Sequence, residues 1–199
     1  MIMPDYKKIT QALNYIAGKE GGEINYMKAL KLLYLADRLH LRKYGRLITD
    51  DRLVAMENGT LGSQAKDIAL KKESLSHEAY EYSEGRLKRD LDKYTIGKKY
   101  DGKESLSETD IECIDNVFSV FGNKDKYYLA ELTHKLPEWK RYEYPIMKGE
   151  KKVVSVKRED LFEPTANQEL NAIYSQSNEE LDMARSLFSE SLEQEKYLT

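Results

Sequence analysis

Few residues of this chain have the types and spacing that metal or thiol chemistry needs. The three histidines are His40, His77 and His134, and none has another histidine or a cysteine three or four residues away, the spacing that places two ligands on one helix face. The single cysteine, Cys113, cannot form an internal disulfide, and it lies in an apolar helical pattern. This pattern favours a small core residue in a reducing compartment, with a reactive thiol as the alternative. We therefore expect no metal ion and no cofactor.

Hydroxyl and carboxylate groups also lack a catalytic motif. No serine lies in a Gly-x-Ser-x-Gly turn, and the stretch 58–62 is too short for a phosphate-binding loop and lacks the lysine of such a loop. Asp50 and Asp51 could hold a hard cation, but adjacent carboxylates at the approach to a hairpin more often form a solvated turn. The sequence predicts no catalytic residue and no enzyme, with an enzyme of unrecognised type as the alternative.

A polar cluster lies near the end of a predicted helix and contains Asp37, His40, Arg42 and Arg46. Asp37 and His40 are separated by one helical turn, so they share a helix face and can join one hydrogen-bond network with a later arginine. Such a network could fix how the helix meets the following strand, or it could anchor a partner. We favour the structural role.

Length and charge set further limits. The 199 residues suffice for one well-buried domain. Lysines and arginines number 32 against 35 aspartates and glutamates, and the net charge of −3 disfavours a nucleic-acid binder that neutralises phosphates. No apolar run approaches the roughly 20 residues that span a bilayer, so we expect a cytoplasmic protein without a membrane partner. The 15 tyrosines suit partner-facing surfaces, with a compositional bias of the source genome as an equal alternative.

Apolar periodicity predicts a mainly helical α+β fold, with a helical core and a small antiparallel hairpin or sheet. The predicted helices cover about residues 9–17, 26–43, 63–70, 107–121, 124–136, 167–174 and 178–198. Short strands are expected at about 47–57, 85–91, 94–98 and 153–156. Gly45 and Pro137 should end their helices, Ser63 should cap the helix that follows it, and Asn58-Gly59 should form a hairpin turn.

The segment from Lys31 to Gly62 has a recognisable order of features. A Leu-rich helix with a tyrosine and an aspartate runs into Tyr44-Gly45-Arg46, a threonine-containing turn and a strand. This order resembles the Panacea domain, also called the SocA-like domain, of bacterial and phage antitoxins. Where the family often has His-Gly-Pro, this chain has Asn58-Gly59-Thr60.

A second stretch, from Leu106 to Trp139, resembles the later half of the same domain, particularly in Leu132-Thr133-His134. Together the two stretches bracket residues 6–145. We therefore expect a Panacea domain over 1–145. Residues 146–199 are expected to form an extension of one strand-like segment and amphipathic helices that packs on the same domain. Part of this extension, residues 165–199, could contact a partner or close the core, and we slightly favour the core.

The resemblance implies an antitoxin that neutralises a protein toxin encoded beside it through direct binding. Family partners include alarmone-synthetase-like toxins and other translation inhibitors. Two alternatives are an adaptor that delivers the toxin to a protease and a regulator that binds its own promoter, although the acidic balance makes a nucleic-acid partner unlikely. The residues expected to bind the partner or to build the motif are Tyr34, Asp37, His40, Tyr44, Arg46, Asp50, Asn58, Gly59, His134 and Trp139.

Overall fold

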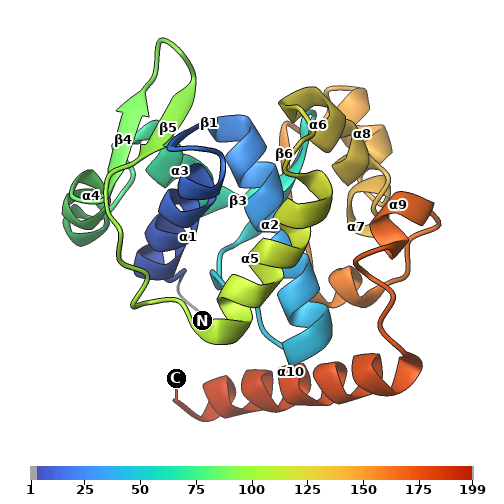
Figure 1. Cartoon of the computed structure of the whole chain (residues 1–199). Helices are drawn as coiled ribbons and strands as arrows, with labels where there is room; N and C mark the ends of the chain where they lie inside the picture. The colour runs from blue at the N-terminus through green and yellow to red at the C-terminus, as the bar shows by residue number, and fades with distance from the viewer. Residues whose placement is uncertain (1–3, 199) are drawn as a thin grey trace.

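A single long helix forms the centre of the computed structural model, which describes residues 4–198. In this helix, α2 (Tyr26–Tyr44), every residue from Ala29 to Arg42 is buried. A helix that is buried all round must be covered on every side by other elements. The helices α1 (Tyr6–Lys19), α5 (Glu108–Phe121) and α10 (Asn178–Leu198) supply much of this cover, and α10 crosses below the end of α2 (Figure 1).

Two antiparallel sheets complete the described part of the fold. One has the strand order β1-β5-β4 and contains β1 (Glu23–Asn25), β4 (Leu87–Asp90) and β5 (Thr95–Lys98). The other has the order β3-β2-β6 and contains β2 (Leu53–Met56), β3 (Gly59–Gly62) and β6 (Val153–Ser155). The predicted class, mainly helical α+β with small antiparallel sheets, is confirmed.

Two elements lie where the sequence predicted neither a helix nor a strand. β1 follows the Gly21-Gly22 pair and pairs with β5, but three residues are too few for an alternating pattern to stand out. The helix α4 (His77–Glu84) has a weak apolar periodicity, and accordingly only Ala79 and Ser83 are buried. A hydrogen bond from the Ala79 amide to the Ser76 hydroxyl caps its start.

The remaining helices are short. They are α3 (Ser63–Leu70), α6 (Lys126–His134), α7 (Pro137–Lys140), α8 (Glu143–Met147), a 3-10 turn η1 (Arg158–Phe162) and α9 (Gln168–Asn171). Of these, α3 and α6 agree with the prediction, whereas α7, α8 and η1 were not predicted. Pro137 does separate two helices, α6 and α7. It occupies the first position of α7, where the missing amide costs nothing. The helix expected over 167–174 is shorter and covers only α9.

The hairpin turn is shifted by one residue from its predicted place. Met56 pairs with Gly59, so the turn residues are Glu57 and Asn58, and Gly59 opens β3 with a φ of 86°. A Cβ at Gly59 would lie 2.1 Å from Thr133 Oγ1. Glycine therefore meets two demands here, a left-handed backbone and close packing of the hairpin against α6.

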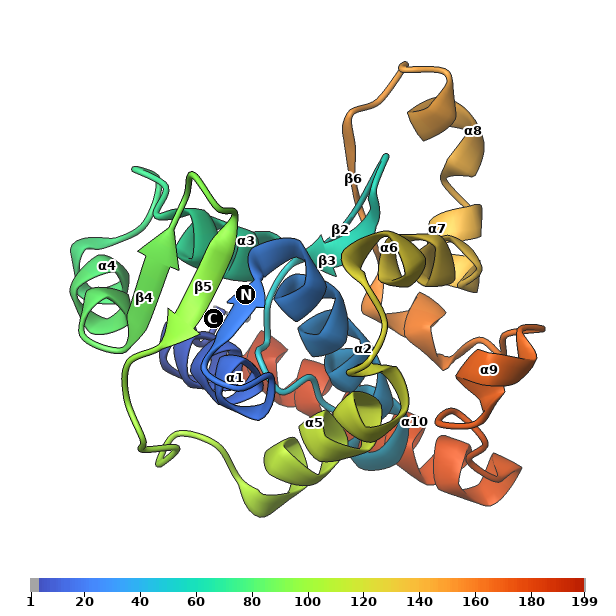
Figure 2. The same cartoon turned by 45° about the horizontal axis from the view of Figure 1, so that its top comes forward.

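The C-terminal extension lies against the rest of the chain. β6 pairs with β2, and α10 buries Leu181, Ala184 and Phe188. The two parts approach closely at Gly45, the left-handed C-cap of α2, where a Cβ would lie 2.6 Å from Ala184 O. Figure 2 shows the segment from α8 to β6 projecting beside the tip of the β2–β3 hairpin. Residue 145 as a domain boundary stays a prediction.

Within the described residues, membrane-spanning helices and metal-binding clusters are both absent. None of the helices within 4–198 combines the length and apolar character needed to cross a bilayer. The same residues contain no group of three His, Cys, Asp or Glu side chains placed to hold a metal ion. Cys113 is buried in the core as predicted, and burial raises the pKa of its thiol to about 12.

Candidate partner-binding site

A buried ion pair joins the middle of α2 to α7. Arg38 Nε donates to Glu138 Oε1 at 2.9 Å, and both side chains are wholly buried. The Tyr34 hydroxyl donates to the same carboxylate oxygen. Tyr34 and Arg38 stand one turn apart on α2, so both reach the same neighbour. Trp139, next to Glu138, donates from Nε1 to Met56 O at 2.9 Å and thereby ties α7 to the end of β2.

The arginines of α2 also hold the C-terminal extension. Arg38 Nη2 donates to Glu163 O at 2.7 Å, and Arg42 Nη1 donates to Phe162 O at 2.7 Å. The ring of Tyr174 lies 4.4 Å from the Arg38 guanidinium, within cation–π range. The motif helix is therefore bonded to segments that follow residue 145.

The end of α2 meets α5 through one carboxylate. Asp110 is buried and lies 2.9 Å from Arg46 Nη2, 2.9 Å from Lys8 Nζ and 3.1 Å from His40 Nε2. Burial acts to raise the pKa of Asp110, but the hydrogen bonds from His40, the Ser107 amide and Lys8, with the charge of Arg46, hold it well below the usual range. The predicted network of His40 with a later arginine is thus present.

Asp37 belongs to a different network. Its carboxylate accepts from the Thr49 amide at 3.0 Å and from the Thr49 hydroxyl at 2.6 Å. Burial raises the pKa of Asp37 to about 7, and the hydrogen bonds from Thr49 offset only part of this effect. The expectation that Asp37 and His40 share one network is wrong, because α2 turns the two side chains toward different neighbours.

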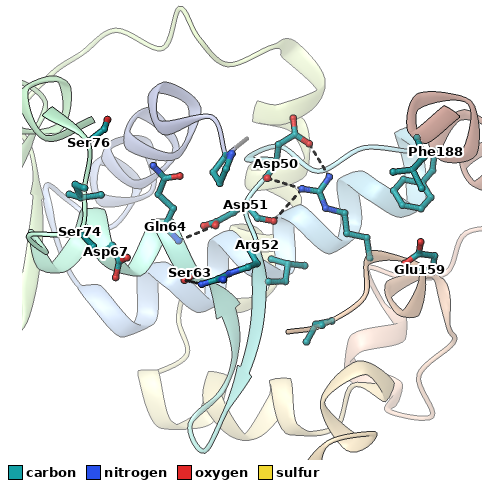
Figure 3. Close-up of a pocket in the computed structure, with 16 residues that line it drawn as sticks. Asp50, Asp51, Arg52, Ser63, Gln64, Asp67, Ser74, Ser76, Glu159 and Phe188 are labelled. Atoms are coloured by element: carbon teal, nitrogen blue, oxygen red, sulfur yellow. Dashed lines mark hydrogen bonds and ion pairs between the residues drawn. The ribbon is translucent and has the colours of Figure 1, made fainter. Parts of the chain in front are cut away.

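The Asp50-Asp51 pair is not the solvated turn that the sequence predicted. Asp51 is fully buried and accepts from the amide of Gln64 at 3.0 Å (Figure 3) and from the amide of Ala65 at 2.8 Å. It therefore caps α3 in place of Ser63, which is the first residue of that helix and makes no cap bond. Burial raises the pKa of Asp51 to about 6.

Asp50 faces the extension. It is half-buried, with a φ of 49°, and Arg158 Nη2 donates to its backbone oxygen at 2.7 Å. The two residues border a pocket of about 670 Å³ between the start of β2, the α3–α4 connection and α10, with Phe188 on one wall (Figure 3). Its lining contains both acidic and basic side chains, so the pocket does not favour a ligand of one charge.

A second pocket, of about 460 Å³, lies at the hairpin turn and includes Asn58 and Gly59. Lys31 projects from α2 beneath this turn and donates to Thr60 O at 2.9 Å. Burial lowers the pKa of Lys31 to about 7. His134 stacks on Trp139 at 4.0 Å between ring centroids, on the α6–α7 side of the hairpin. The two resemblance stretches thus meet around this turn.

Comparison with protein families shows to which family these elements belong. The model of the family described as antitoxin SocA-like, Panacea domain, matches residues 30–140, more than half of the chain. The chain belongs to this family. The matched residues run from within α2 to the end of α7 and include the Arg38–Glu138 ion pair, the Asp37–Thr49 hydrogen bonds, the α3 cap and the hairpin turn. Searches of curated proteins and of solved structures found no match.

The structure separates the ten candidate residues of the Panacea motif by exposure. Tyr34, Asp37, His40, Gly59 and Trp139 are buried; Tyr44, Arg46, Asp50 and His134 are intermediate; Asn58 is exposed. Three kinds of residue were not among the candidates predicted from the sequence: Glu138, Asp51 and the lysines at the second pocket. Glu138 stands beside Trp139 in the second resemblance stretch, which was its only signal, and nothing local shows that Asp51 caps a helix after an intervening hairpin.

Proposed function

We propose that this protein is an antitoxin that acts in the cytoplasm and neutralises a toxin encoded beside it by binding directly to that toxin. The observation that carries the proposal is the family match over residues 30–140. The family shows an antitoxin domain, while the toxin and the mode of neutralisation are our inference.

The arrangement of polar groups supports binding by a preformed surface. The buried members of the motif make their hydrogen bonds to the chain itself, as Tyr34 does with Glu138 and Asp37 does with Thr49. We infer that these residues hold the domain in shape and that the exposed face around them contacts the toxin. Large exposed side chains suited to an interface include Tyr127 at 69% and Tyr144 at 67% exposure.

Co-expression with each neighbouring gene product tests the proposal. We expect the chain to restore growth in the presence of one such product and to copurify with it as a stable complex. A stop codon at Lys31 is the control, because it separates rescue by the protein from rescue by its RNA. Growth inhibition by a neighbour that the full chain neither relieves nor binds would refute direct neutralisation.

Two further measurements separate the alternatives. In a pulse-chase experiment, the lifetime of the toxin should not change when the chain is present, whereas a protease adaptor would shorten it. In a gel-shift assay with the upstream DNA, we expect no specific complex, and a salt-sensitive specific complex would favour a promoter-binding regulator.

A further inference from the structure

The pocket at the hairpin turn, which we call the lysine pocket, is formed by four separate parts of the chain. Its walls come from the first turns of α2, the β2–β3 hairpin, Lys66 of α3 and the segment from the end of α8 toward β6, and it encloses about 460 Å³. The α8–β6 connection lies outside the matched family region. Figure 2 shows this connection projecting next to the hairpin. The pocket therefore combines the Panacea motif with the chain-specific extension.

The charges at this pocket are mostly positive. Lys66, Lys151 and Lys152 line it together with Lys31, and Glu57 is the one acidic residue in its lining. This balance contrasts with the net charge of −3 for the whole chain. Lys151 and Lys152 are exposed, so they are available to a partner. A local positive field in an acidic protein selects an anionic group.

Lys31 lies beneath the pocket and adds to this field when its amine is protonated. Its side chain is buried, and among the described residues its single hydrogen bond is to Thr60 O, although an ammonium group has three donors. Solvent screens a buried charge much less than an exposed one. Burial lowers the pKa of Lys31 to about 7, and a carboxylate close by would favour its charged form.

Exposed apolar side chains in the same α8–β6 segment as Lys151 and Lys152 indicate what kind of anion would bind. Tyr144, Met147 and Val153 are exposed by 67%, 60% and 51%, and all three belong to the α8–β6 segment. A free phosphate or another small anion gains nothing from such neighbours. A polypeptide with acidic residues beside apolar ones can use both features, as the centre and rim of a protein interface do.

We propose that the lysine pocket receives an acidic segment of the protein partner, whose carboxylates pair with Lys66, Lys151 and Lys152 above the buried Lys31. The exposed side chains of Tyr144, Met147 and Val153 pack against apolar residues of the same segment. This inference deepens the proposed antitoxin function and rests on it, because that function supplies the protein partner.

A titration with oligoglutamate tests the chemistry of the pocket without the toxin. We would follow the backbone amides of the full chain by NMR, with oligoglutamine as the neutral control peptide. Oligoglutamate should shift the amides of Gly59, Gly149 and Lys152, and the double variant Lys151→Glu/Lys152→Glu should lose about tenfold in affinity at low salt. Equal shifts from inorganic phosphate, or shifts spread over every basic surface, would overturn the proposal.

A matched variant controls for net charge. Lys7→Glu/Lys88→Glu makes the same change in charge at two exposed lysines that lie outside the pocket lining, and it should bind as the wild type does. In the second arm, both double variants are measured against the toxin identified by co-expression, and only Lys151→Glu/Lys152→Glu should bind it more weakly. If both bind the toxin as tightly as wild type, the inference is wrong while the antitoxin function stands. Failure of every neighbour in co-expression would refute the antitoxin function and with it the toxin as the partner, whereas the oligoglutamate titration would still show whether the pocket binds an acidic peptide.

Discussion

The buried carboxyl group of Asp37 makes the stability of the fold depend on pH in an unusual direction. Asp37 accepts two hydrogen bonds from Thr49, yet burial raises its pKa from 3.8 to about 7. The folded chain therefore holds this proton more tightly than the unfolded chain does. The resulting stabilisation is fully present below about pH 4 and is lost as the pH rises to about 7.

Replacing Asp37 by asparagine should remove this dependence. Asparagine has nearly the same shape, its amide oxygen can accept from the Thr49 amide, and it never ionises. The two pKa values of Asp37 set an upper bound of ~4 kcal/mol for the whole effect, of which about 3 kcal/mol falls between about pH 5 and pH 8. We expect Asp37→Asn to gain that much stability relative to wild type over this interval.

Urea unfolding followed by circular dichroism at several pH values measures the difference between the two proteins. Asp110→Asn is the matched control, because Asp110 is also buried but is paired with Lys8 and Arg46, and its pKa is depressed. Its contribution is present at neutral pH and lost on acidification, so Asp110→Asn should destabilise the chain at pH 7. A stability difference between wild type and Asp37→Asn that stays flat with pH would refute the reasoning.

Three further substitutions test the packing. Asp51→Ala leaves two amides at the start of α3 without their acceptor and should cost about 2 kcal/mol in urea unfolding, with Asp51→Asn closer to wild type; equal losses would contradict the capping role. Gly45→Ala places a side chain at a φ of 70° and against α10, so limited proteolysis should release α10 sooner, and unchanged protection would argue against this contact. Glu138→Ala leaves the Arg38 charge buried without its partner and should cost about 3–5 kcal/mol, whereas a loss under about 1 kcal/mol would mean that Arg38 finds solvent.

Patterns that are local in sequence predicted much of this fold. The helix α2, its end at Gly45 and the hairpin before Gly59 all follow from neighbouring residues, although burial of α2 on every side does not. The elements α4 and β1 have little apolar periodicity of their own, so the sequence did not predict them. Sequence alone recovers an element when its own residues carry the signal.

The candidate site was less predictable because its contacts are distant in sequence. The polar residues near the end of α2 were found, but Asp37 and His40 point to different networks. Asp51 caps a helix that begins after an intervening hairpin, and Glu138 meets Arg38 across a hundred residues. Pairings of this kind depend on how the elements pack, which spacing along the chain does not reveal.

The contact between α10 and Gly45 constrains how this sequence can diverge. The left-handed conformation at position 45 by itself would tolerate asparagine, which adopts it more readily than other side chains. The backbone of α10, 2.6 Å from where a Cβ would lie, removes that option. Relatives that keep this last helix should therefore retain glycine at this position, while those that have lost the helix are free to drift toward asparagine.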